Sequence, residues 1–462
     1  MKKLLFSLTA GFMMFGSVSA SGESLLDIYQ LALENDAQLK ADEAAYRAGL
    51  EMRAIGRANL LPQINGSAQY TEGETDRTDY TAEPTTTFTS DSSSKGWSIS
   101  LNQPLFDMAS WYNYRRGVTL SERAEAEFAA AQQQLILRVA EAYFNVLRAT
   151  DNLETARAEE KALEQQLEQT RQRYEVGLTA VTEVHEAQSV YDSARATVLQ
   201  AQGNLNNAYE ALEVLTNQSH DRIAPLSEDF VVTSPVPADR HEWVQFALEN
   251  NYQLKAARLN SEAARQNARA ARAQHLPTLT GTARYSSNRN DGSQINGEEL
   301  FDNPAFSDVK TEGHSFGVTL NVPLYSGGRT SAQRRQAAAE QLLSQEQANV
   351  TERNIIQATR ALHLAVDLGV SQVYARRQAI ISSESALEAT QAGYEVGTRN
   401  LVEVLLAQRA VYQARRDYDN ALYDYIINSF ELRQVAGMLT PADIEQVDAN
   451  LQRNAAGNSG NF

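Results

Sequence analysis

The side chains that most often carry chemistry are few and scattered in this chain of 462 residues. It has no cysteine, which excludes thiol catalysis, disulfide bonds and a lipid-modified N-terminal cysteine. The histidines form no HExxH or HxH pair, and they stand at positions 185, 220, 241, 275, 314 and 363. Gly327-Gly328 lacks the spaced glycines and the lysine of a phosphate-binding loop. We therefore expect no catalytic residue, no metal and no cofactor.

The overall charge and hydropathy exclude two further classes of protein. The chain has 41 Lys and Arg against 58 Asp and Glu, a formal net charge of −17 at pH 7. That balance argues against a nucleic-acid-binding protein, which needs a basic face. A mean hydropathy of −0.44 excludes a polytopic helical membrane protein, but it does not exclude membrane strands.

The first 20 residues are typical of a secretory signal peptide. Lys2 and Lys3 precede an apolar run that ends in Val18-Ser19-Ala20, so we expect cleavage near Ala20. A single membrane anchor is the alternative, but a run of about 15 residues is shorter than the roughly 20 needed to span a bilayer. We expect no transmembrane helix after cleavage, so any membrane-embedded part must consist of strands.

The rest of the chain contains two copies of one repeated sequence unit. Four stretches recur in the same order, at offsets of 215 to 220 residues: 32–41 as 247–256, 61–64 as 276–279, 100–106 as 319–325, and 174–177 as 394–397. These matches define a first repeat over 21–215 and a second over 241–436. Between them lies a proline-containing linker, 216–240, and a small appendix, 437–462, follows the second repeat.

Each repeat is predicted to contain two strands with period-two alternation of apolar and polar residues. The four strands lie at about 63–72, 96–105, 278–286 and 314–325, with polar loops over 71–95 and 286–313. Their lengths are near the 9–11 residues of a tilted membrane strand, although a soluble sandwich would alternate in the same way. Membrane strands must close into a barrel of about eight or more, so several chains would have to share one.

A long helical hairpin follows each strand pair, over about 107–215 and 330–436. Heptad rows predict packing on both sides of each long helix, as in the wall of a tube. Gly177 and Gly397 mark the hairpin tips. An ordinary periplasmic coiled-coil spacer without a pore is the alternative, but it does not explain the strand pairs or the duplication.

Taken in this order and duplicated, the motifs resemble the TolC family of outer-membrane exit ducts. The residues that carry the resemblance are the paired Tyr-Glu-Val-Gly tips, both Leu-Pro pairs and the run Pro323-Leu324-Tyr325-Ser326-Gly327-Gly328-Arg329. The resemblance implies a mainly α fold with membrane β, in which a homotrimer shares a 12-stranded β-barrel in the outer membrane. A periplasmic α-barrel continues that β-barrel.

The resemblance also implies a function and a set of partners. The family conducts proteins, through type I secretion, or drugs passively out of a Gram-negative cell. An inner-membrane transporter, ABC or proton-driven, supplies the energy, and a periplasmic adaptor joins it to the duct. Outer-membrane lipid is the remaining partner that we expect.

Candidate site residues follow from the family by motif position. The links that hold the periplasmic tip closed map to Thr182, Glu183, Tyr394 and Arg399. The family's constriction ring of two aspartates maps to Glu403 and Leu406, so one ring position is apolar here. A further linked pair maps to two uncharged residues, Gln166 and Gln391. The transitions between strands and helices map to four prolines, Pro62, Pro104, Pro277 and Pro323.

Overall fold

The computed structural model describes residues 22–81, 85–227, 229–296 and 308–451. The expected signal peptide and the tail 452–462 lie outside these residues. The described chain divides into two units, each considered by itself. One, the sheet unit, comprises 44–128 and 253–352. The other, the tip unit, comprises the remaining described residues.

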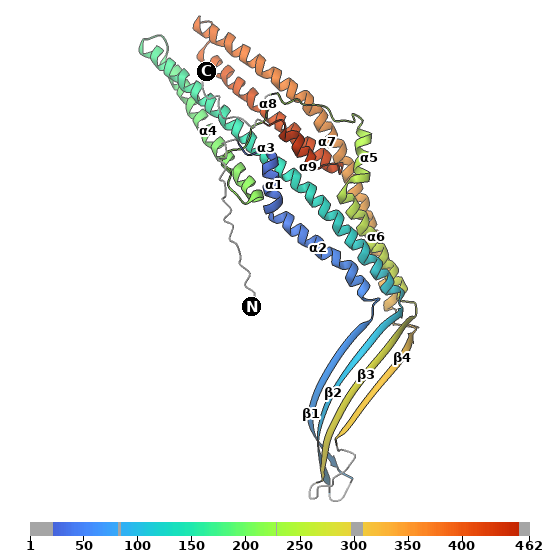
Figure 1. The fold of residues 1–462 in the computed structure, drawn as a ribbon. Coiled ribbons are helices and arrows are strands. Elements are labelled where there is room, and N and C mark those ends of the chain that lie inside the picture. Colours follow the sequence, from blue (N-terminus) through green and yellow to red (C-terminus); the bar gives the residue numbers. More distant parts are fainter. Residues whose placement is uncertain (1–21, 82–84, 228, 297–307, 452–462) are drawn as a thin grey trace, which may run out of the picture. The chain divides into compact units, whose positions relative to one another are not determined.

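Four antiparallel strands form the sheet of the sheet unit, in the order β1-β2-β3-β4 (Figure 1). They span Gln63–Asp79 (β1), Thr86–Phe106 (β2), Thr278–Asn296 (β3) and Val309–Asn321 (β4). The register places one apolar row side by side across the sheet: Ile64, Leu101, Ala283 and Phe316. The next row is polar: Asn65, Ser100, Arg284 and Ser315. Since successive rows point to opposite faces, one face is apolar and the other polar.

The strands differ in length from the sequence prediction. The β1–β2 ladder continues to the pair Asp79 and Thr86, through residues predicted to be loop. β3 likewise runs on to Asn296, whereas β4 ends at Asn321 rather than near 325. Backbone hydrogen bonds form the ladder, so it persists where the side chains are polar on both faces. Cross-strand bonds such as Thr89 Oγ1 to Asp76 Oδ1, at 2.7 Å, support this extension.

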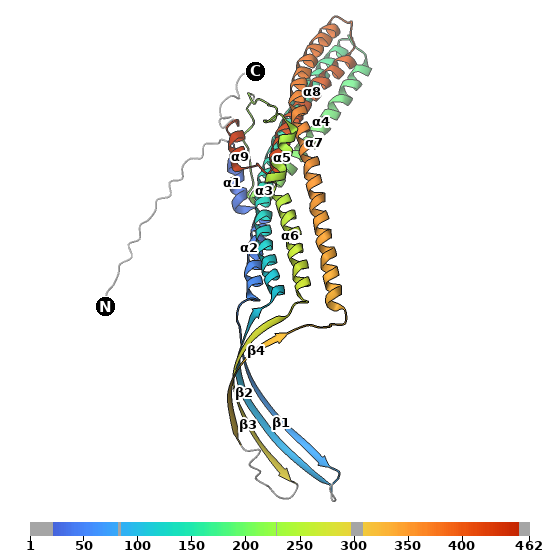
Figure 2. The same cartoon turned by 90° about the vertical axis from the view of Figure 1, so that its right-hand side faces the viewer.

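All four strands meet helices at the same end of the sheet (Figure 2). The helices are α2 (Ala37–Ala58), α3 (Met108–Glu175), α6 (Tyr252–Ala273) and α7 (Arg329–Glu395). Pro62 and Pro277 directly precede β1 and β3, and Pro323 follows β4. Pro104 lies at a register irregularity in β2, past the Gln63–Asn102 pair that begins the β1 ladder, so β1 loses no hydrogen bond there.

Two helical hairpins dominate the tip unit. The α3 residues from 129 onward turn back into α4 (Val181–Thr216), and the α7 residues from 353 onward turn back into α8 (Leu401–Val435). Three shorter helices accompany them: α1 (Leu25–Asn35), α5 (Arg240–Asn250) and α9 (Pro441–Asp448). No helix among the described residues is long and apolar enough to cross a membrane.

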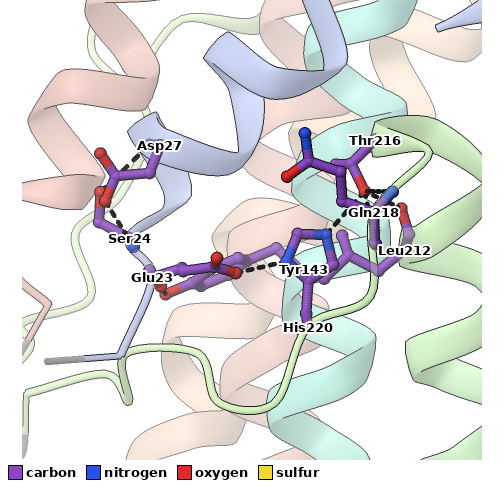
Figure 3. Close-up of polar contacts among 8 residues, drawn as sticks. All are labelled: Glu23, Ser24, Asp27, Tyr143, Leu212, Thr216, Gln218 and His220. Atoms are coloured by element: carbon purple, nitrogen blue, oxygen red, sulfur yellow. Dashed lines mark hydrogen bonds and ion pairs between the residues drawn. The ribbon is translucent and has the colours of Figure 1, made fainter. Parts of the chain in front are cut away.

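The start of the described chain is fixed to the linker between the repeats (Figure 3). The backbone N–H of Glu23 donates to the Arg222 carbonyl at 3.1 Å, and the Glu23 carboxylate pairs with His220. On the other side of its ring, His220 Nε2 lies 2.7 Å from Thr216 Oγ1. Tyr143 of α3 donates to the Ala224 carbonyl at 2.7 Å. These bonds join residues far apart in sequence into one network, which is buried except at the Glu23 side chain.

Candidate functional site

Both hairpin tips have the same backbone. Gly177 and Gly397 take left-handed φ angles of 75° and 80°, which glycine adopts without strain. The next residue in each tip donates its N–H back into the long helix, Leu178 to Arg173 at 2.8 Å and Thr398 to Gly393 at 2.9 Å. The duplicated sequence thus forms one duplicated turn.

An apolar cluster lies beneath the tips and joins the two hairpins. It contains side chains of α3, α4 and α8: Leu163, Leu167, Ala187, Ala194, Leu401 and Leu405. Tyr394, at the end of α7, packs against its edge. The cluster therefore holds the polar tip residues of both hairpins within reach of one another.

Tyr394 makes a polar contact between the hairpins at their tips. Its hydroxyl donates to Glu183 Oε2 at 3.5 Å, and the Arg173 guanidinium lies over its ring, 4.9 Å from the centroid. Burial raises the pKa of Tyr394 above its ordinary value, so the hydroxyl keeps its proton and remains a donor. This contact unites two of the four residues predicted to hold the tip closed.

Arg399 instead bonds within its own hairpin. Its Nη1 donates to Glu403 Oε2 at 2.6 Å, one helical turn away. Asn400 caps α8 by accepting from the Glu403 N–H at 2.9 Å, and its own amide donates to Glu403 Oε1 at 3.0 Å. Glu403, expected at the constriction, is thus held by two neighbours in the second tip.

The remaining predicted positions make no such contacts within one chain. Thr182 is exposed, and its side chain forms no hydrogen bond in the described part of the chain. Leu406 is 57% exposed. Gln166 and Gln391, the other expected pair, form no bond to each other among the residues that the structure describes. Of the predicted tip links, one chain therefore forms only that of Tyr394 with Glu183 among the described residues.

The sequence analysis missed an acidic cluster further along the same hairpins. Tyr423 of α8 donates to Asp151 Oδ2 of α3 at 2.5 Å, and Asp419 lies one turn before Tyr423. Burial raises the pKa of Asp151 to about 6 and that of Asp419 to about 7, the latter helped by the charge of Asp151. Only the packing of α8 on α3 brings these residues together.

Within the described ranges, no group of three or more His, Asp or Glu side chains is placed to hold a metal ion.

The family model described as "Outer membrane efflux protein" matches residues 28–218 and 243–438. The chain belongs to the outer membrane efflux protein family. It is an outer-membrane protein, and it acts as an export channel of the TolC type.

Curated relatives and a solved structure agree with this membership. The chain is 38% identical over 455 residues to outer membrane protein TolC of Vibrio cholerae, covering 98% of this chain and 99% of that protein. It is 32% identical to the alkaline protease secretion protein AprF of Pseudomonas aeruginosa, covering 97% and 92%. The Campylobacter jejuni CmeC outer membrane channel has the same fold, with a TM-score of 0.74, 16% identity and 98% coverage of both chains.

Proposed function

We propose that three copies of this chain close one 12-stranded β-barrel in the outer membrane, continued by an α-barrel in the periplasm. The observation that carries the proposal is an open sheet with one apolar face. β1 and β4 are its outer strands, and neither has a second strand partner among the described residues. Lipid cannot satisfy bare strand edges, and four strands are too few to close, so neighbouring copies supply the missing partners.

Cross-linking tests this arrangement directly, because the chain has no native cysteine. Cysteines at Ser67 in β1 and Ser315 in β4, in the same chain, should give disulfide-linked oligomers up to a trimer. The matched control places cysteines at Ser98 and Ser286, which pair directly between β2 and β3. That pair should link only within one chain. Monomers alone from the first variant would contradict the shared barrel.

We further infer that the hairpin tips form the gate. The support is the Tyr394–Glu183 bond between hairpins, together with Thr182 and Arg399, which stand exposed beside it. In a ring of three chains, Arg399 could exchange Glu403 for a carboxylate or hydroxyl of the adjacent tip. Glu403 would face the bore as a cation-preferring constriction, with Leu406 as an apolar ring beside it.

The proposed duct conducts passively and catalyses nothing. A periplasmic adaptor and an inner-membrane transporter would open the tip and drive the cargo, the transporter being ABC or proton-driven. The relative named as an alkaline protease secretion protein favours protein cargo, and the family description as outer membrane efflux protein favours efflux. The cargo that we propose is therefore protein, through type I secretion, or drugs. Single-channel recording in planar bilayers tests the pore, since a spacer without a pore would show no conductance.

A further inference from the structure

Arginines gather where the sheet meets the helices, although the chain as a whole is acidic. Four segments flank this junction: 52–63, 103–117, 267–280 and 322–339. Together they contain nine arginines and one acidic residue, Asp107. Asp107 is engaged in capping α3, where it accepts from the Ala109 N–H at 2.9 Å. The junction is therefore strongly cationic.

Part of this cationic junction is hollowed into a pocket of about 750 Å³. Its polar lining comes from α3, the end of α6 and the start of α7: Tyr112, Arg269, Arg272, His275, Ser331 and Arg334. Within the described chain, none of the three arginines has a hydrogen bond or an ion pair to another side chain. A pocket with several exposed guanidinium groups that form no ion pair suits an anion, and the planar guanidinium matches a phosphate.

Helix stabilisation does not account for all of these arginines. Arg272 lies in the last turn of α6, where a cation offsets the negative end of the helix. Arg334, however, lies near the beginning of α7, where the helix end is already positive and the first turn has no acidic residue. A cation there is unfavourable for the isolated helix, whereas an anion bound between Arg334 and the positive end of α7 compensates both.

The apolar surroundings indicate where that anion comes from. Met108, Ala273 and Leu276 complete the pocket lining, and Leu276 is three residues from Leu279 in β3. Exposed apolar and aromatic side chains surround the strand ends of the junction: Leu105, Phe106, Trp111, Leu324 and Tyr325. Aromatic residues of this kind mark the headgroup level of a membrane. A basic pocket at that level is suited to the phosphate of a lipid headgroup.

We propose that this junction pocket binds the phosphate of an anionic phospholipid in the periplasmic leaflet of the outer membrane. The proposal rests on the proposed function, which places the apolar face of the sheet in lipid. The phosphate lies between Arg269, Arg272 and Arg334, with the Ser331 hydroxyl as a further donor. The acyl chains leave past Leu276 along the apolar face.

Lipid binding to the delipidated full chain in detergent tests the proposal. Phosphatidylglycerol and phosphatidylcholine with identical acyl chains are titrated, and bound lipid is counted by native mass spectrometry. We expect about tenfold or greater preference for phosphatidylglycerol. Replacing Arg269, Arg272 and Arg334 together by glutamine should abolish that preference, and replacing all three by lysine should retain most of it.

A matched control removes the same charge elsewhere. Arg353, Arg360 and Arg377 are exposed on α7, distant in sequence from the junction, and their replacement by glutamine should leave the preference unchanged. Equal preference in the wild type and the junction glutamine variant would overturn the proposal. Inorganic phosphate that displaces the lipid at equal concentration would overturn the lipid as the source.

Conductance separates this proposal from the one on which it rests. A wild-type protein that conducts in planar bilayers but shows no lipid preference refutes only the junction pocket. A wild-type protein that forms no channel refutes the proposed function itself.

Discussion

The two hairpin tips share a backbone but differ in how their side chains are held. Positions 220 residues apart correspond, so Glu183 matches Glu403 and Thr179 matches Arg399. In the second tip, Arg399 and Asn400 hold Glu403. In the first tip, the Thr179 hydroxyl is buried without a hydrogen-bond partner in the described structure, and Glu183 reaches to the other hairpin.

The same asymmetry continues along the returning helices. On α8, Asp419 and Tyr423 belong to the acidic cluster on α3. Their counterparts on α4 are Leu199, which is 70% exposed, and Gly203, where a side chain would meet open space. The two hairpins therefore share a fold. The polar contacts of the tip and of the returning helix, however, are found mainly on the second hairpin. Substitutions in the second hairpin should accordingly have the larger effects.

The largest effect on conductance should come from removing the side-chain bonds of both Arg399 and Tyr394. The double change Arg399→Ser with Tyr394→Phe removes two bonds, each worth up to about 1 kcal/mol. Each loss shifts a closed–open equilibrium by up to about fivefold, so single-channel conductance should rise several-fold. Thr179→Ser, at the position matching Arg399, is the control and should leave conductance unchanged. Unaltered conductance in the double variant would reject the assignment of the gate.

Removing the second-tip carboxylate should change ion selectivity. Glu403→Gln takes one negative charge per chain from the proposed constriction, so the preference for cations should fall by roughly twofold or more. The reversal potential under a salt gradient measures this preference. Glu183→Gln is the matched change in the first tip, and an equal loss in both variants would mean that the two tips are equivalent.

The acidic cluster should make stability depend on pH. A carboxyl whose pKa is raised on folding destabilises the folded state where it ionises, so the penalty is absent below about pH 4 and complete above about pH 7. Asp419→Asn should therefore stabilise the protein by about 1–2 kcal/mol at pH 8 and by little at pH 4. Thermal unfolding at both pH values measures the difference. Leu199→Asn at the matching α4 position should show no such difference between pH 4 and pH 8, and an equal shift there would refute the cluster as its source.

The smallest effect is expected for Tyr394→Phe alone. Its bond to Glu183 is long, at 3.5 Å, so its contribution should be below about 1 kcal/mol. A double-mutant cycle with Glu183→Ala should give a small but non-zero coupling in thermal unfolding. Strict additivity of the two changes would show that the Tyr394–Glu183 bond does not help to join the hairpins.

Local patterns made the order of the elements readable from the sequence. Heptads and period-two alternation each describe one segment, and the structure has strands and long helices in the order that they indicate. The polar ends of the strands were not readable, because a ladder of backbone bonds needs no apolar side chains. The pairing of Asp151 with Tyr423 was also hidden, since it depends on which helices pack together.

Site residues divide in the same way. The motif position of Tyr394 and Glu183 predicted a pair that one chain forms. Arg399, on the second tip, is predicted to join the links between the tips, yet within one chain it pairs with Glu403, one helical turn away. Asn400, three residues before Glu403, is a helix N-cap signal that can be recognised in the sequence.

The hydrogen-bond network at Glu23 shows which linker residues hold the start of the first copy in place. A half-length chain that stopped with α4 would lose His220, the partner of Glu23, and would lose the Ala224 carbonyl, the nearer of the two acceptors of the Tyr143 hydroxyl. A fragment that ran on through Ala224 would keep both. The contacts of the first copy therefore extend into the segment that the sequence assigns to the connection between copies.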